Sequence, residues 1–88
     1  MQGKTSSGFK FEVNEDAVKS MEFIDLINDL DEKPTMIGKV IKFMLGEDQK
    51  ERLYTHVRGG RKFTPAEGVN KEVEEIFNLI NEAPETKN

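Results

Sequence analysis

The first regular pattern in the chain is a short alternation of apolar and charged residues. It covers Phe9–Val13, where the odd positions are apolar and the even positions are charged. A period of two is typical of a strand that buries one face. Because a lone strand needs a partner strand or a helix to cover it, we expect a short β-strand or hairpin here. Residues 1–8 are small and polar, and we expect them to be a flexible N-terminus.

After this strand the apolar residues recur at helical spacing. An apolar residue occupies every third position from Val18 to Leu30, which predicts a helix over about Glu15 to Asp31. Asn14 is a suitable N-cap for this helix. Pro34 ends it, because the residue before a proline is pushed out of helical geometry.

Two shorter helices are expected next. Thr35 is a candidate N-cap for a helix over about Met36 to Leu45, and Gly46 is a natural C-terminal stop. A mostly polar helix over about Glu47 to Val57 follows, and the pair of glycines after it breaks the helix.

The last helix has the clearest signals. Thr64-Pro65-Ala66-Glu67 has the pattern of a capping box with proline at the first helical position. The helix is expected from Pro65 to about Glu82. The chain therefore predicts a mainly α fold, a small four-helix domain over residues 9–83 with a short N-terminal β-strand or hairpin. Residues 84–88 are expected to be frayed.

Composition limits the classes of function. The 88 residues allow one small domain, and an apolar content of 35% allows only a modest core. The absence of cysteine excludes disulfides and cysteine-based zinc sites. A net charge of −4 argues against binding to nucleic acid through the overall field. No apolar run reaches the roughly 18 residues of a membrane helix, and we expect a soluble cytoplasmic protein without membrane contact.

The sequence offers little catalytic chemistry. His56 is the only histidine, and no cysteine is available to complete a metal site with it. The serines have no neighbouring base in the sequence, so no hydrolase triad is visible. We expect no enzymatic activity, no cofactor and no bound metal.

One segment is rich in basic residues, and aromatic residues lie among them. It contains Lys50, Arg52, Tyr54, Arg58, Arg61, Lys62 and Phe63. Such a pattern can bind single-stranded nucleic acid. Glu47, Asp48 and Glu51 offset much of its charge, so nucleic-acid binding is the less favoured alternative to a solvated loop or a loop that contacts an acidic protein.

Apolar residues outside the helical stripes suggest a protein-binding surface. Phe23 and Phe43 fall out of line with the stripes around them, and the chain has four methionines, which suit adaptable surfaces. The alternative, left open here, is a core shared by helices that pack on several sides. The candidate contact residues are Phe23, Met36, Ile37, Phe43 and Phe63. An unpaired strand and a small core are also compatible with a homo-oligomer.

The order and spacing of several short motifs resemble a known family. Phe9–Val13 reads F-x-F-E-V, Met44–Gln49 is similar to L-L-G-E-x-Q, Leu53–Gly60 is similar to L-x-x-H-L/V-R followed by a turn, and Glu75–Phe77 reads E-I-F. In this order, and with the Lys-Asn ending, the chain resembles the small tail assembly chaperones of long-tailed (siphovirus-like) bacteriophages and prophages of Gram-positive bacteria. The Gly59-Gly60-Arg61-Lys62 turn departs from the acidic turn of that family.

The resemblance implies a non-enzymatic function in tail assembly. Such chaperones bind the long tape measure protein and keep it soluble while the tail tube polymerises around it. The implied partners are the tape measure protein and, as a further candidate, the tail tube protein. The implied location is the host bacterial cytoplasm, with the chaperone absent from the mature virion. The alternatives are another small phage adaptor, such as a head–tail or regulatory interaction protein, and a nucleic-acid-binding regulator.

Overall fold

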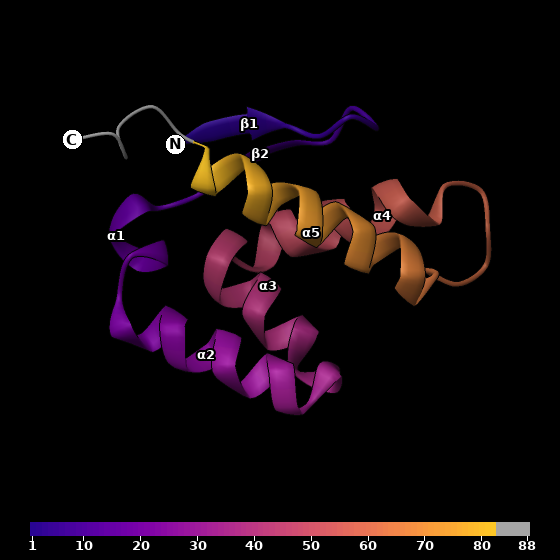
Figure 1. Ribbon diagram of the computed structural model, residues 1–88. Coiled ribbons are helices and arrows are strands. Elements are labelled where there is room, and N and C mark those ends of the chain that lie inside the picture. The colour runs from indigo at the N-terminus through magenta and orange to yellow at the C-terminus, as the bar shows by residue number, and fades with distance from the viewer. Residues whose placement is uncertain (83–88) are drawn as a thin grey trace.

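A hairpin and five α-helices make up the computed structural model, which describes residues 1–82 (Figure 1). In chain order the elements are β1 Gln2–Lys4, β2 Lys10–Glu12, α1 Glu15–Val18, α2 Met21–Glu32, the 3₁₀ turn η1 Pro34–Met36, α3 Ile37–Leu45, α4 Glu47–Arg58 and α5 Ala66–Asn81. The expected fold class, mainly α with a short N-terminal hairpin, is confirmed. The expected frayed segment, residues 84–88, lies outside the described residues.

The N-terminal segment is more ordered than we expected. β1 pairs antiparallel with β2, with Gly3 opposite Phe11, and Thr5 is buried. The amino group of Met1 donates to the carbonyl oxygen of Val13 at 3.0 Å, and the Val13 amide donates back to Met1 at 2.8 Å. The expectation of a flexible segment is therefore wrong for Met1 to Lys4, because backbone amides and carbonyls of this segment are hydrogen-bonded to β2 and Val13.

The outer edge of β2 is closed by a side chain from α4. The Glu12 amide donates to Oε1 of Gln49 at 2.8 Å, and Nε2 of Gln49 donates to the Glu12 carbonyl oxygen at 2.8 Å. This pair of bonds reproduces the pairing that a third strand would make. It fixes the hairpin to α4.

The first expected helix is split in two. The chain leaves helical geometry at Lys19, and Ser20 becomes the N-cap of α2. The Ser20 hydroxyl accepts from the Phe23 amide at 3.2 Å and donates to the Ala17 carbonyl oxygen at 2.7 Å. A serine that bonds nearby backbone groups competes with helix continuation, so this residue ends α1 and starts α2.

Two further expected caps are absent from the described structure. Thr35 lies inside η1, which begins at Pro34, and α3 has no side-chain cap bond. Thr64 does not cap α5, whose N-cap is Pro65. The Thr64 hydroxyl instead accepts from Arg58 at 3.0 Å and lies 3.5 Å from the Tyr54 carbonyl oxygen, so it ties the α4–α5 loop to α4.

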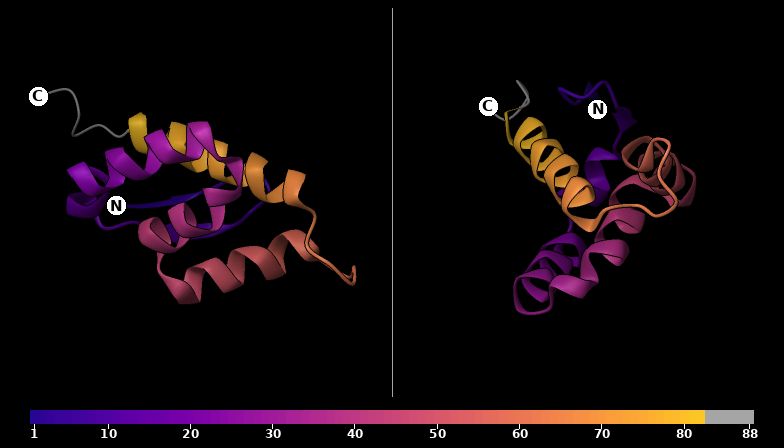
Figure 2. Two further views of the ribbon diagram at one scale, coloured as in Figure 1. Left: turned by 90° about the horizontal axis from the view of Figure 1, so that it is seen from below. Right: turned by 90° about the vertical axis from the view of Figure 1, so that its right-hand side faces the viewer.

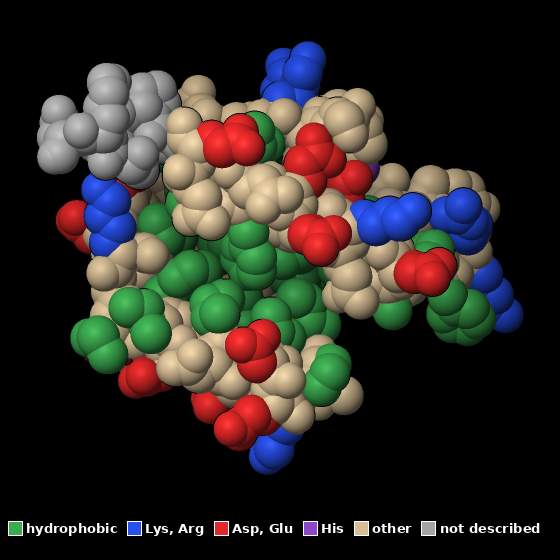
Figure 3. Space-filling view, in the orientation of Figure 1, with side chains coloured by type: hydrophobic (Ala, Val, Ile, Leu, Met, Phe, Trp, Pro, Cys, Tyr) green, Lys and Arg blue, Asp and Glu red, His purple; other side chains and the backbone are tan. Residues whose placement is uncertain are grey.

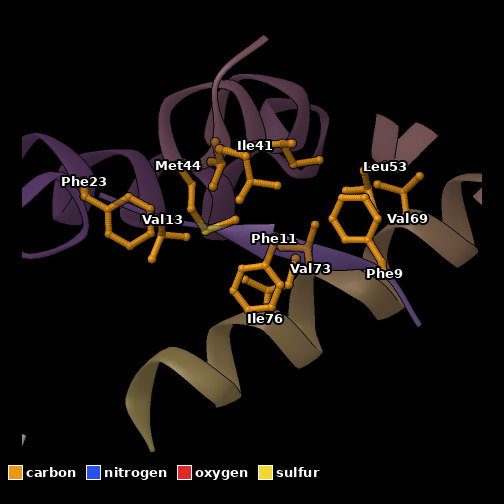
Figure 4. Packing of buried hydrophobic residues seen from close by; sticks show 12 residues of the cluster. Phe9, Phe11, Val13, Phe23, Ile41, Met44, Leu53, Val69, Val73 and Ile76 are labelled. Atoms are coloured by element: carbon orange, nitrogen blue, oxygen red, sulfur yellow. The ribbon is translucent and has the colours of Figure 1, made fainter. Parts of the chain in front are cut away.

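The core lies between the hairpin and helices α3, α4 and α5 (Figure 4). The hairpin places its apolar face on these helices, while α2 packs mainly against α3 and η1. The buried apolar residues are Phe9, Phe11, Val13, Phe23, Val40, Ile41, Met44, Leu45, Leu53, Val69, Val73 and Ile76. Gly46, with a φ of +86°, makes the turn from α3 to α4, as expected of a helix stop.

Candidate protein-binding site

The five candidate contact residues do not form one surface. Phe23 is buried, whereas Phe43 is 39% exposed and its ring stacks on that of Phe23 at a centroid distance of 6.2 Å. Met36 and Ile37 are half-buried at the junction of η1 and α3. Phe63 is 75% exposed. The structure therefore brings Phe23 and Phe43 together.

Phe63 belongs to a different part of the molecule. It lies in the loop between α4 and α5, which projects away from the helices at the right of Figure 1. Its ring contacts Lys62, whose ammonium group lies 5.6 Å from the ring centroid. An exposed aromatic residue on this loop is separated from α2, so it is a candidate contact of its own.

An apolar groove runs between α2 and α5. Figure 3 shows apolar side chains gathered in a hollow between these two helices, with carboxylates on both sides. The groove has a volume of about 330 Å³. Its lining residues come from α1, α2 and α5 and are Val18, Phe23, Ile24, Ile27, Asn28, Phe77, Ile80 and Asn81.

The groove exists because the helices meet at few points along their lengths. The Phe23 ring meets the Phe77 ring edge-on at a centroid distance of 6.2 Å. Beyond this contact α2 packs mainly against α3 and η1 (Figure 2). Ile27 of α2 and Ile80 of α5, which line the groove, are only half-buried. Ile24 is 46% exposed, although it is a large apolar residue. A fixed aromatic contact flanked by exposed aliphatic side chains is suited to accept a further apolar side chain.

Sequence reasoning missed most of this groove. The apolar stripe predicted at every third position from Val18 to Leu30 includes Ile24, which the structure leaves 46% exposed. Steps of three residues drift around an α-helix by about 60° each, so a stripe built from them winds off the core face. Steps of three and four from Phe23 give Leu26, Ile27 and Leu30 as the inner face of α2 and leave Ile24 outside it. That spacing is the signal that could have found the exposed residue.

The lone histidine takes part in a polar cluster at the hairpin turn. Ser7 Oγ donates to the Glu72 carboxylate at 2.8 Å and lies 2.9 Å from Nε2 of His56. Since the single hydroxyl hydrogen goes to Glu72, the imidazole is the donor in the second bond. The amide and the hydroxyl of Ser6 both donate to Glu75, at 2.6 and 3.0 Å. The cluster holds the turn on α4 and α5, and His56 is not placed as a base for Ser7.

The three arginines of the basic segment make contacts within the fold. The Arg52 guanidinium lies over the Phe9 ring, 5.4 Å from its centroid. Arg58 donates to the hydroxyls of Thr55 and Thr64, and Arg61 donates to the Val57 carbonyl oxygen. These contacts give the basic segment a role in the structure of α4 and of the loop that follows it.

Residues 1–82 contain neither a candidate metal site nor a candidate membrane-spanning helix. This part of the chain brings together no group of three or more histidine, cysteine, aspartate or glutamate side chains suited to a metal ion. None of its helices has the length and apolar character needed to span a bilayer. Comparison of the chain with family models, with curated proteins and with solved structures finds no match.

Proposed function

We propose that this protein is a tail assembly chaperone of a long-tailed bacteriophage or prophage, and that it binds the tape measure protein and keeps it soluble. Two independent features support the proposal. The first is the order of short motifs along the chain, which resembles that family. The second is the groove between α2 and α5, which exposes apolar side chains on a domain with a closed core.

The groove is the structural observation that most strongly supports the proposal. A tape measure protein is long and helical, and its apolar stripes must be covered until the tail tube surrounds them. A groove between two helices receives an amphipathic helix through side chains at i, i+3, i+4 and i+7. Ile24 and Ile80 line the groove around the ring of Phe77 and would contact such a stripe.

The proposed action needs no catalytic chemistry. Each bound copy would shield part of a tape measure helix from water and from other tape measure helices, and polymerising tail tube would displace it. On this proposal the protein acts in the host bacterial cytoplasm and is absent from the mature virion. The tail tube protein is then a competitor for the same surface or a second partner.

Co-expression with the tape measure protein of the same phage tests the proposal. The tape measure protein is expressed with and without an affinity-tagged copy of this chain, and the soluble fraction is purified and measured by light scattering. We expect the tape measure protein to be soluble only in the co-expression and to elute with several copies of this chain. An insoluble tape measure protein beside a soluble, unbound chaperone would contradict the proposal, and recovery of this chain from mature particles would favour an adaptor.

A further inference from the structure

The two helices that form the groove carry a charge unlike that of the rest of the chain. α2 contains five acidic residues and no basic residue, and α5 contains four acidic residues and one lysine. The remaining residues of the chain include eight acidic and twelve basic ones, so they are net positive although the whole chain has a net charge of −4. The net negative charge of this protein is therefore concentrated on the two helices that form the groove.

Two of these acidic residues lie just beyond the lining residues of the groove along α2 and α5. Asp31 lies four residues after Ile27 on α2, and Glu74 lies three residues before Phe77 on α5, which are spacings that place residues on one helix face. Both acidic residues are exposed. Figures 1 and 2 show that α2 and α5 run in opposite directions. Asp31 comes after the lining residues of α2 and Glu74 comes before those of α5, so both positions are displaced toward the same end of the groove.

The acidic end of α2 is unfavourable for the isolated domain. The last turn of α2 contains Asp29, Asp31 and Glu32, and Lys33 follows at the C-cap, so acidic residues outnumber basic ones at a helix end that favours cations. The two ion pairs found within residues 1–82 join the Met1 amino group to Glu15 and Lys42 to Glu47, so neither involves α2 or α5. A partner with positive charge beside the last turn of α2 would reduce the repulsion among these carboxylates.

We infer that the groove between α2 and α5 binds an amphipathic helix whose apolar stripe is flanked by lysine or arginine, and that Asp31 and Glu74 contact those cations. The inference deepens the proposed function, on which it rests only for the identity of the natural partner. It predicts that the segments of the tape measure protein bound by this chain are net positive. The apolar residues that line the groove supply most of the affinity, and the two carboxylates select a partner of positive charge.

Two synthetic peptides test the inference directly. Both carry leucines at i, i+3, i+4 and i+7, and their flanking positions are lysine in one peptide and glutamate in the other. Fluorescence anisotropy measures their affinity for the full chain at low and high salt. We expect the lysine peptide to bind at least about tenfold more tightly than the glutamate peptide at low salt, and the difference to shrink at high salt.

Two double variants with the same change of net charge separate local contacts from the overall field. Asp31→Lys/Glu74→Lys reverses the carboxylates at the groove, and Glu12→Lys/Glu51→Lys reverses exposed ones on β2 and α4. We expect the first variant to bind the lysine peptide about tenfold more weakly and the second to change its affinity less than about threefold. Equal effects of the two variants, or equal binding of the two peptides by the unaltered chain, would overturn the inference. Circular dichroism checks that both variants fold.

The tape measure protein then separates this inference from the proposed function. If Asp31→Lys/Glu74→Lys solubilises the tape measure protein as well as the unaltered chain does, the charge preference is wrong and the chaperone function stands. If the chain fails to solubilise the tape measure protein but selects the lysine peptide through Asp31 and Glu74, the charge preference is supported and the chaperone function is wrong.

Discussion

At Gly3 the missing side chain leaves room for the ring of Phe11 on the neighbouring strand. A Cβ at this position would lie 2.6 Å from Cζ of Phe11, well inside van der Waals contact. The ring is itself held in the core, where Phe11 is buried. We expect Gly3→Ala to lower the free energy of unfolding by about 1–3 kcal/mol through overpacking, measured by chemical denaturation.

Gly60 provides the matched control for this substitution. A Cβ at Gly60 meets no atom within 4 Å. The change Gly60→Ala is therefore expected to leave the unfolding free energy within about 1 kcal/mol of its original value. Similar losses in the two variants would show that Gly3 is not needed for the packing of Phe11.

Gly68 makes a second close approach, between α5 and α4. A Cβ at Gly68 would lie 2.6 Å from Cγ1 of Val57, a side chain with little rotamer freedom in a helix. Alanine stabilises a helix by about 1 kcal/mol relative to glycine, which opposes the effect of this clash. If Gly68→Ala proved stabilising, the contact with Val57 would be relieved at little cost. We expect the clash to dominate and Gly68→Ala to be destabilising. The double variant Gly68→Ala/Val57→Ala should then lose less than the sum of the two single losses, as a double-mutant cycle of unfolding free energies would measure.

Among the helices, the break between α1 and α2 depends on one hydroxyl. Ser20 caps α2 and also bonds back to Ala17, so it orients two helices at once. We expect Ser20→Ala to lower the free energy of unfolding by about 1 kcal/mol, as measured by thermal or chemical denaturation. Ser20→Asp keeps an acceptor for the amides of α2 and should recover most of the loss. If the two variants are equally unstable, capping of α2 is not the reason for the break.

The same elements show how far the sequence predicts the fold. The alternation over Phe9–Val13 predicts a strand, which the structure has at Lys10–Glu12. The helices expected over Glu47–Val57 and Pro65–Glu82 match α4 and α5 to within one residue at each end, because glycine and proline mark those ends. β1 consists of Gln2, Gly3 and Lys4 and has no apolar side chain that could show a period. The apolar group beside it is the ring of Phe11, which belongs to β2. The break at Ser20 was missed because apolar residues continue at helical spacing across it. Local hydrogen bonds decided that position, and periodicity does not report them.

The candidate site was less predictable than the fold. Composition identified surplus apolar residues, and the structure brings Phe23 and Phe43 together as a stacked pair. It places Phe63 on a separate loop. The groove is formed mainly by residues from α2 and α5 that are 49 or more positions apart in the chain. The spacing of residues along α2 could have placed Ile24 outside its inner face. That α5 lies across from Ile24 and completes the groove depends on tertiary packing, which no local pattern contains.

At the scale of the whole molecule, the proposed function predicts that the exposed apolar residues contribute unequally to binding of the tape measure protein. Ile24 lines the groove, whereas Phe63 lies on the distant loop and is more exposed, 75% against 46%. Ile24→Gln removes apolar contact area without adding charge, and glutamine is a good helix former. We expect this variant to weaken binding of the tape measure protein by about tenfold, a loss of about 1.4 kcal/mol. Pull-down from co-expressing cells and titration with the bound tape measure segment measure the change.

Phe63→Gln is the matched control, because it makes the same kind of polar substitution at the more exposed residue. If exposed apolar surface binds the tape measure protein without selectivity, this variant should lose more affinity than Ile24→Gln. If the groove is the binding site, Phe63→Gln should bind as the unaltered chain does. Since neither side chain is fully buried, both variants should remain folded, and circular dichroism verifies this before binding is compared. Binding that is lost only in Phe63→Gln would assign the site to the α4–α5 loop and contradict the groove.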